Sequence, residues 1–381
     1  MMKRPTVILI GGFLGAGKTT LLLHVAKHLA GRGKKVGLIT NDQASDMVDT
    51  RLIRQHEIPV REVAGSCFCC NFNALVGATD SLRDEAAAEI ILAESVGSCT
   101  DLSATIMQPM KEKLHQQYAL SPVSVVVDPL RLTEIYPELS FAGLSPEARV
   151  STLHESAGYI VRKQMEEADF LLLNKMDLLS RKELEEVTAL LAKEYPQAIV
   201  LGISAVTGDG VESWLEQLFA MPKAGTHIAA VDYDIYAEGE AILGWLNAAV
   251  SLRQKSGQGK WREFCQKLMA ELDGAFTGAH ADTGHVKIII ANGKNSIISN
   301  LTRTAAAPGL HGDIPAAVPD VEMLINARVE MTPERLEGIV RTALSDACAL
   351  LDIEATVTAL KSLSPGRPEP TWRYATVWDA S

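Results

Sequence analysis

The stretch GFLGAGKT, at positions 12–19, constrains the fold of this chain more than any other part of it. It matches the pattern G-x-x-x-x-G-K-[ST], with a short apolar run before it and a helical pattern after it. Glycines in this pattern let backbone N–H groups wrap a phosphate chain, and the helix N-terminus adds partial positive charge. We predict that Lys18 reaches the β- and γ-phosphates and that Thr19 offers its hydroxyl to Mg²⁺. The predicted phosphate-binding residues are Gly12, Gly15, Ala16, Gly17, Lys18, Thr19 and Thr20.

Short apolar runs alternate with helical patterns through the first part of the chain. The runs lie at residues 6–13, 35–42, 90–93, 121–130, 168–179 and 197–205. Strands that alternate with helices predict a mostly parallel sheet covered on both faces. The expected fold class is therefore α/β, of the P-loop type.

The pattern changes near residue 222, so we predict a first domain at 1–222 and a smaller α+β domain at 223–381. In the second domain we expect a strand at 227–237 and helices at 238–253, 259–276 and 332–352. A hairpin should turn at Asn292-Gly293, a strand should follow at 322–331, and residues 305–320 should form a loop. Thr332 and Pro333 are typical of a helix start.

Asn174-Lys175-Met176-Asp177 follows an apolar strand and has the form N-K-x-D, which resembles the guanine-reading motif of GTPases. The carboxylate of Asp177 can accept from the guanine N1–H and its exocyclic amine, which adenine does not present together. Asn174 and Lys175 would brace that pocket. Ser204-Ala205, at the end of the next strand, would complete it.

Acidic residues at two other strand ends suit hydrolysis. Glu94 ends the strand IILA and can hold the water shell of Mg²⁺, while Gly97 can lend its N–H to the γ-phosphate. Asp42 ends the second strand and could contact Mg²⁺ or orient water; an ordinary turn or cap acid is the alternative. Asp128 has the same ambiguity, and there we favour a structural role. The expected catalytic residues are Lys18, Asp42 and Glu94.

Three of the six cysteines, Cys67, Cys69 and Cys70, fall within four positions. Three close thiolates suit Zn²⁺ or a similar divalent ion. Adjacent cysteines face opposite sides of a straight strand, so the three can converge only at a turn, which Gly65 and Ser66 supply. Three ligands leave a tetrahedral site open, as a metal that is handed over requires. A redox pair and buried core thiols are the alternatives.

Composition limits the partners. The formal net charge is −11, which argues against a nucleic-acid partner because phosphate binding requires a basic face. No run approaches the roughly 18 apolar residues of a membrane span. Six cysteines in 381 residues form no disulfide framework, so we expect a cytoplasmic protein with no membrane partner.

Together these motifs resemble the CobW-type metallochaperone GTPases, relatives of UreG and HypB. GFLGAGKTT, NDQASD, CFCC, ESVG and NKMD occur in the family's order within residues 1–220. The resemblance implies GTP and Mg²⁺ binding, slow hydrolysis, a Zn²⁺ or Co²⁺ cargo, delivery to a client metalloprotein and pairing as a homodimer. The second domain would recognise the client.

One departure from the family concerns a fourth cysteine. Relatives often continue E-x-x-G with Ala-Asp-Pro, whereas this chain has Ser98-Cys99-Thr100-Asp101. We hypothesise that Cys99 swings toward the other three in one nucleotide state and becomes a fourth ligand. A free cysteine on a mobile loop is the alternative.

Two further functions remain open on sequence grounds. The first is a nucleotide-gated assembly or activation factor for a corrinoid or other metalloenzyme, without metal transfer. The second is a small-metabolite kinase, which N-K-x-D argues against and which a preference for ATP would support.

Overall fold

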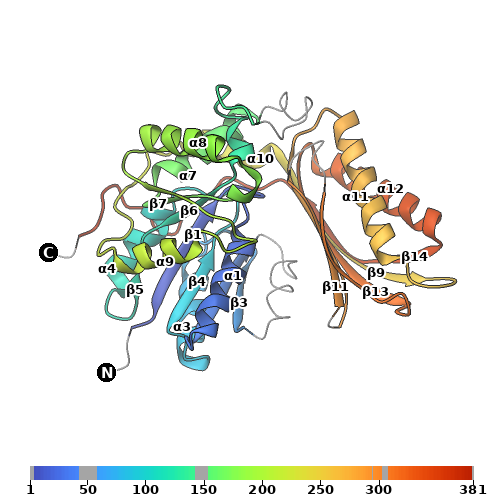
Figure 1. The fold of residues 1–381 in the computed structure, drawn as a ribbon, viewed down its shortest axis with the longest axis horizontal. Coiled ribbons are helices and arrows are strands. Elements are labelled where there is room, and N and C mark those ends of the chain that lie inside the picture. The colour runs from blue at the N-terminus through green and yellow to red at the C-terminus, as the bar shows by residue number, and fades with distance from the viewer. Residues whose placement is uncertain (1–3, 43–57, 142–152, 294, 303–307, 380–381) are drawn as a thin grey trace.

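The computed structural model describes residues 4–42, 58–141, 153–293, 295–302 and 308–379. Within these ranges a parallel sheet with helices on both faces is followed by an antiparallel sheet with helices on one face (Figure 1). The predicted combination of an α/β part and a smaller α+β part is confirmed.

The first sheet has the strand order β3-β2-β4-β1-β6-β7-β8, with β5 beside β1, and its described pairs are parallel. Parallel strands place their carboxyl ends at one edge, where the polar motifs of this chain gather. Its strands are β1 (Thr6–Gly12), β2 (Val36–Asp42), β3 (Val60–Ala64), β4 (Ile90–Glu94), β5 (Ala119–Leu120), β6 (Ser124–Val127), β7 (Phe170–Leu173) and β8 (Ile199–Gly202).

Alternate residues of these strands enter two cores. Ile8 and Ile10 of β1 pack with α1 and α9 on one face, whereas Val7 and Leu9 pack with the helices of the other face. The strands are therefore apolar on both sides, as a sheet covered on both faces requires. The helices are α1 (Lys18–Gly31), α3 (Phe72–Glu85), η1 (Ser103–Met107), α4 (Gln108–Leu114), α5 (Pro129–Leu132), α7 (Glu155–Glu166), η2 (Met176–Leu178), α8 (Arg181–Glu194) and α9 (Val211–Ala220).

The second sheet has the order β12-β11-β10-β13-β9-β14 and is antiparallel in its described pairs. Its core lies between the sheet and two helices, which Figure 1 shows on the side turned away from the first sheet. The elements are β9 (Leu243–Gln254), α11 (Trp261–Gly278), β10 (Thr283–Asn292), β11 (Asn295–Leu301), β12 (Gly309–Asp313), β13 (Asp320–Glu330), α12 (Pro333–Leu351) and β14 (Ile353–Leu363).

Three expectations for the second part are wrong in whole or in part. Where a strand was expected at 227–237, residues 227–232 form neither helix nor strand, and residues 233–237 begin helix α10 (Tyr233–Ala241), whose N-terminus is capped by the side chain of Asp232. The helix expected at 238–253 is mostly the long strand β9, which pairs with both β13 and β14. Part of the loop expected at 305–320 forms β12. The hairpin at Asn292-Gly293 and the helix capped by Thr332 are confirmed.

Two segments assigned to the second domain by sequence lie against the first sheet's helices. Helix α10 packs on α7 so closely that a Cβ on Gly239 would lie 2.4 Å from the carbonyl oxygen of Ser156. Residues 364–379, which we call the strap, leave β14 and return across the first part. The boundary at residue 222 therefore stays a prediction, and only β9 to β14 form the separate sheet.

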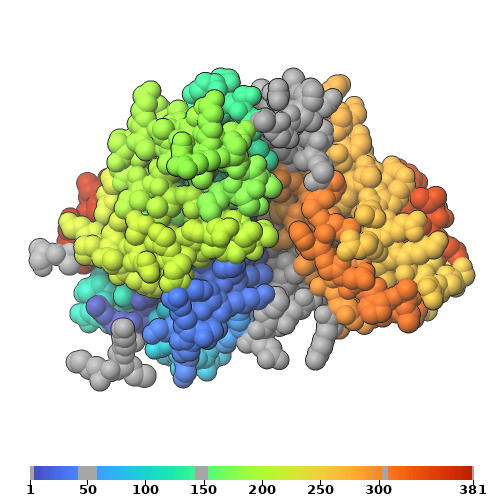
Figure 2. All heavy atoms as spheres, in the orientation of Figure 1, coloured from blue at the N-terminus to red at the C-terminus, as the bar shows by residue number. Residues whose placement is uncertain are grey.

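The two parts also meet at the phosphate loop, where a Cβ on Gly15 would lie 2.9 Å from the side chain of Thr302. Figure 2 shows the blue-to-green and orange parts adjoining. The buried guanidinium of Arg131, on α5, pairs with Glu134 at 2.6 Å and donates to the carbonyl oxygens of Thr283, Gly284 and Thr302. These carbonyls belong to or border strands of the second sheet, so one side chain ties α5 to that sheet.

Among the described residues, no helix has both the length and the apolar character needed to cross a membrane.

Candidate nucleotide site and thiol cluster

The loop between β1 and α1 has the backbone that only its glycines allow. Gly12, Gly15 and Gly17 have φ values of +130°, +75° and +98°. A Cβ on Gly12 would lie 2.3 Å from the carbonyl oxygen of Val126, so the loop also passes too close to β6 for a side chain. Lys18 begins α1, and its buried amine donates to the carbonyl oxygens of Gly12 at 2.8 Å and Phe13 at 3.2 Å.

Thr19 and Glu94 meet at the carboxyl edge of the sheet. The Thr19 hydroxyl donates to Oε1 of Glu94 at 2.9 Å, because β4 lies beside β1 with Glu94 opposite Ile10. A hydroxyl and a carboxylate are hard oxygen ligands, so this pair fits Mg²⁺. Gly97 packs against the phosphate loop, since a Cβ there would lie 2.7 Å from a methyl group of Leu14.

Asp42 is the last residue of β2, but its side chain and residues 43–57 lie outside the described residues. Its predicted contact with Mg²⁺ or water stays a prediction. Thr20 lies on α1 and is exposed.

The N-K-x-D residues follow β7 and lie beside the phosphate loop and the Ser204-Ala205 turn. The buried amide of Asn174 donates to the carbonyl oxygen of Ala16 at 2.7 Å and accepts from the N–H of Ala205 at 2.9 Å. Asp177 is exposed in η2, and the Ser204 hydroxyl accepts from the Thr207 N–H. One side chain thus connects the phosphate loop with the Ser204-Ala205 turn.

Lys175 pairs with Asp128, for which the sequence left two roles open and favoured the structural one. Its amine lies 2.6 Å from Oδ2 of Asp128, and its φ of +59° is left-handed. Asp128 also caps α5 by accepting from the Leu130 N–H. Burial opposes the charge of Asp128, but Lys175 and then Arg131 outweigh it and hold the pKa of that carboxyl below its usual value.

The cysteines lie on the predicted turn after β3. Gly65 has a φ of +91°, and the N–H groups of Cys70 and Asn71 both donate to the carbonyl oxygen of Cys67. Asn41, in β2, fixes this turn from the neighbouring strand: its Nδ2 donates to the carbonyl oxygens of Val63 and Ser66, and its Oδ1 accepts from the Phe68 N–H at 2.9 Å.

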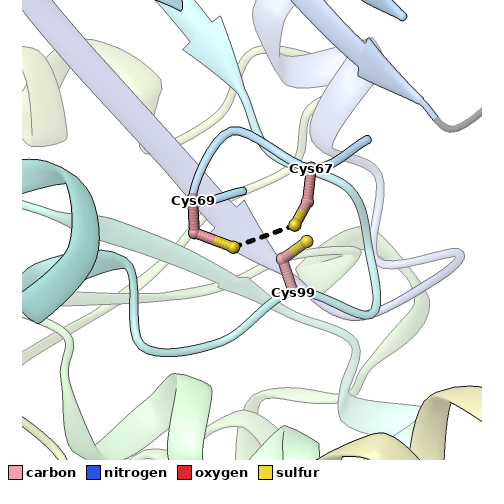
Figure 3. Close-up of side chains that lie close together, drawn as sticks. All are labelled: Cys67, Cys69 and Cys99. Atoms are coloured by element: carbon pink, nitrogen blue, oxygen red, sulfur yellow. Dashed lines mark hydrogen bonds between the residues drawn. The ribbon is translucent and has the colours of Figure 1, made fainter. Parts of the chain in front are cut away.

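The sulfur atoms converge as predicted, but with an additional member. Sγ of Cys67 lies 2.8 Å from that of Cys69 and 3.2 Å from that of Cys70. The sulfurs of Cys67, Cys69 and Cys99 all lie within 4.8 Å of one another, and all three residues are buried (Figure 3). Cys70 is partly exposed. No swing is needed to bring Cys99 to the cluster.

Charge is unevenly distributed among the thiols. Hydrogen bonds from Cys69, Cys70 and Cys99 hold the pKa of Cys67 well below that of an ordinary thiol. The contact with Cys67 raises the pKa of Cys69, and burial raises that of Cys99. The contacts among the sulfurs therefore favour loss of a proton from Cys67 before the other thiols.

The strap covers the cysteine turn. Thr371 donates through its N–H to the carbonyl oxygen of Cys69 at 2.8 Å and through its hydroxyl to that of Cys70 at 3.0 Å. Further along the strap, Arg373 pairs with the buried carboxylate of Asp101 at 2.6 Å. The strap thus holds both the turn and the segment that carries Cys99.

The sequence analysis missed four residues that organise the site, namely Asn41, Asp128 as the partner of Lys175, Gln164 and Thr371. The side chain of Gln164 donates to the carbonyl oxygens of Gly97 at 3.0 Å and Cys99 at 2.7 Å. Only Asn41 and Asp128, at the ends of apolar runs, carried a local signal.

Known proteins resemble the chain over this region. The family described as "CobW/HypB/UreG, nucleotide-binding domain" matches residues 6–201. Zinc-regulated GTPase metalloprotein activator 1 of Dictyostelium discoideum is 25% identical over 246 residues, which cover 59% of this chain and 51% of that protein. Zinc chaperone YjiA of Escherichia coli (strain K12) is 30% identical over 188 residues, which cover 48% of this chain and 52% of that protein. Zinc chaperone CobW of Pseudomonas aeruginosa is 28% identical over 220 residues, which cover 52% of this chain and 56% of that protein. The chain spans about half the length of these relatives.

Proposed function

Because the chain belongs to the CobW/HypB/UreG family of nucleotide-binding domains, we propose that it is a GTPase that binds a divalent metal ion and delivers it to a client metalloprotein. The observation that carries the metal proposal is the convergence of buried thiols at the same sheet edge as the phosphate loop. Zn²⁺ is the first candidate cargo, since the names of the three relatives refer to zinc, and Co²⁺ is the second.

Guanine selection is assigned to the N-K-x-D residues. The carboxylate of Asp177 is exposed, so both of its oxygens are accessible to accept hydrogen bonds from guanine. Lys175, held by Asp128, can flank the base with its aliphatic stem. Asn174 sets the distance between this pocket and the phosphate loop through its two buried hydrogen bonds.

Hydrolysis is assigned to the phosphate end of the site. Lys18 can leave the loop carbonyls for the β- and γ-phosphates, and the Gly97 N–H can meet the γ-phosphate. Thr19 and Glu94 would hold Mg²⁺, which supplies charge for the phosphate oxygens when bound. Asp42 stays the proposed residue that orients the attacking water.

Metal binding is assigned to Cys67, Cys69 and Cys70, the ligands predicted from sequence. Thiolates select borderline and soft divalent ions such as Zn²⁺ and Co²⁺ over Mg²⁺. Because these ions bind thiolates rather than thiols, metal binding would release protons from the cysteines.

Client recognition is assigned to residues 223–381. Arg131 and the phosphate loop both contact this part of the chain, so a nucleotide-dependent change can reach it. We keep the homodimer and the cytoplasmic location as predictions from the sequence.

A second candidate function is a nucleotide-gated activation factor that keeps its metal. The strap over the cysteine turn favours it, because a covered thiol site retains an ion more readily than an open one. Transfer of the ion separates the two functions.

The experiment starts with protein purified from its native host and measures its metal content. The proposal expects about one zinc or cobalt ion per chain, lost when Cys67, Cys69 and Cys70 are all replaced by serine. The matched control replaces Cys265 and Cys348, two buried cysteines of the second core, and should keep the metal. Equal metal content in both variants would refute the assigned site.

The second arm follows the nucleotide and the fate of the metal. We expect tighter binding of GTP than of ATP, and movement of ⁶⁵Zn to a thiol acceptor peptide only during GTP turnover. Turnover without transfer would favour the activation factor, and a preference for ATP would exclude the GTPase proposal.

A further inference from the structure

We infer that Cys99 is a metal ligand and that it couples the metal site directly to the Glu94–Gly97 segment, with Cys70 as the exchangeable ligand at the surface. This inference rests on the proposed function, because it concerns the same cluster. It changes the ligand set from three adjacent cysteines to four thiols from two segments of the chain.

The geometry singles out Cys99. Its sulfur lies within 4.8 Å of those of Cys67 and Cys69, and the three sulfurs face one another in Figure 3. Cys99 is 1% exposed, Cys67 is 4% and Cys69 is 2% exposed, so these three form the enclosed side of the cluster. Four thiolates around one ion would complete a tetrahedral zinc site, whereas three leave one position open.

Cys70 occupies a different position. Its sulfur lies 3.2 Å from that of Cys67 and 3.8 Å from that of Cys69, but the residue is partly exposed. An acceptor's thiol can approach the ion only from the side that solvent reaches. Cys70 is therefore the ligand that an acceptor replaces, and Thr371 of the strap lies over its carbonyl group.

The segment that carries Cys99 also carries the nucleotide contacts. Glu94, which meets Thr19, and Gly97, which packs on Leu14 of the phosphate loop, precede Cys99 by five and two residues. Gln164 holds the carbonyl groups of Gly97 and Cys99 together from α7. If the γ-phosphate shifts the backbone of Gly97, the backbone and sulfur of Cys99 should therefore shift with it.

The competing explanation is that Cys99 only fills space in the core. Cys265 and Cys348 show what a packing cysteine looks like in this protein: both are buried in the second core. Neither joins a group of possible metal ligands within the described part of the chain. Cys99, by contrast, belongs to the one group of possible metal ligands found among the described residues, together with the predicted ligands Cys67 and Cys69.

The first test counts sulfur ligands in the unaltered full-length protein loaded with Zn²⁺ alone. X-ray absorption should show four sulfurs at about 2.3 Å. Cys99→Ser should leave three sulfur ligands and weaken zinc binding at least about 10-fold. Replacing a residue that only supports a metal ligand already lowers metal affinity by about this factor. Cys265→Ser is the matched control and should keep both values.

The wild-type measurement remains decisive if Cys99→Ser does not fold, and Cys99→Ala is a second variant. Three sulfurs in the wild type, or an unchanged zinc affinity in a folded Cys99 variant, would overturn the inference. A wild type that binds no zinc or cobalt would instead refute the proposed function.

The second test measures coupling. Zinc affinity is compared between the GDP-bound protein and the protein bound to a non-hydrolysable GTP analogue. The preference for the analogue over GDP is then compared with and without zinc, because the change in this preference must equal the ratio of the two zinc affinities. The wild type should give a ratio clearly different from one, and Cys99→Ser a ratio near one. A ratio that Cys99→Ser leaves unchanged would overturn the coupling.

A third measurement concerns Cys70. Cys70→Ser should weaken zinc binding much less than Cys99→Ser does. It should, however, slow the transfer of zinc to a thiol acceptor peptide. Loss of affinity equal to that of Cys99→Ser, with normal transfer from the remaining bound ion, would overturn the assignment of Cys70 as the exchangeable ligand.

Discussion

The side-chain amide of Asn174 lies 2.7 Å from the carbonyl oxygen of Ala16 and so joins the N-K-x-D segment to the phosphate loop. Its other end accepts from the N–H of Ala205 at 2.9 Å. Both hydrogen bonds are buried, so the spacing between the two ends of the nucleotide site depends on one side chain.

Asn174→Ala should therefore affect both stability and nucleotide binding. It leaves the buried Ala205 N–H and Ala16 carbonyl without this partner, which should lower the free energy of unfolding by about 1–3 kcal/mol. GTP and GDP should both bind more weakly, because the loop and the base pocket lose their common support. Urea unfolding and nucleotide titration measure the two effects. Asn73→Ala, at an exposed position of α3, should lower the free energy of unfolding by no more than about 0.5 kcal/mol; a loss there as large as that of Asn174→Ala would contradict the explanation.

Asp177→Asn should change nucleotide preference without changing stability. The side chain is exposed, so the fold loses little. An amide offers one acceptor and one donor where the carboxylate offers two acceptors, so GTP should bind about 10- to 100-fold more weakly. Xanthosine triphosphate, with a carbonyl in place of the exocyclic amine, should bind better than it does to the wild type. Equal GTP affinity in variant and wild type would remove Asp177 from the base pocket.

Changes at Thr371 should speed the release of metal in a graded way. Thr371→Val removes the hydroxyl bond to Cys70, and Thr371→Pro also removes the N–H bond to Cys69. One hydrogen bond is worth about 1 kcal/mol, so each loss should raise the release rate about fivefold. Stopped-flow capture of Zn²⁺ by a chelator gives the rate, and GTP affinity serves as the control. Identical rates in all three proteins would show that the strap does not retain the metal.

Glu240 should make the stability of the metal-free protein depend on pH. Burial and then nearby Cys67 raise the pKa of this carboxyl from 4.5 to about 8, although a hydrogen bond from Ser98 opposes the shift. The folded state thus binds the proton more tightly than the unfolded state, and this contribution to stability is lost as pH rises from about 4.5 through 8. Relative to Glu240→Gln, whose amide does not titrate, the wild type should lose at most about 1.4 kcal/mol per pH unit across this window. Urea unfolding of both proteins at several pH values tests this, and a constant difference between them would contradict it.

Local patterns were sufficient for much of the first part. The glycine spacing of the phosphate loop and the apolar strand before it allow few alternatives, because each glycine needs a positive φ or a close backbone approach. The same holds for Glu94 and Asn174, which end apolar strands whose carboxyl ends must share one edge of a parallel sheet.

The residues around 243–254 show where local patterns fail. The stretch LGWLNAAVSL is apolar at spacings that fit a helix as well as a strand. The structure makes it a strand because it pairs along its length with β13 and β14, which lie far away in sequence. Only the Asp232 cap, which starts the preceding helix, carried a local signal that the prediction overlooked.

The sequence by itself predicted a phosphate-binding loop and an N-K-x-D base-reading motif, and it determined that three cysteines lie on one turn, because each motif acts within a few residues of its own backbone. Only the tertiary structure decided that Cys99 joins those cysteines, that Asn41 and Gln164 hold the two cysteine-bearing segments, and that the strap covers them. Those relationships connect residues separated by 27 to 302 positions, and only the packing of the whole chain can bring such residues together.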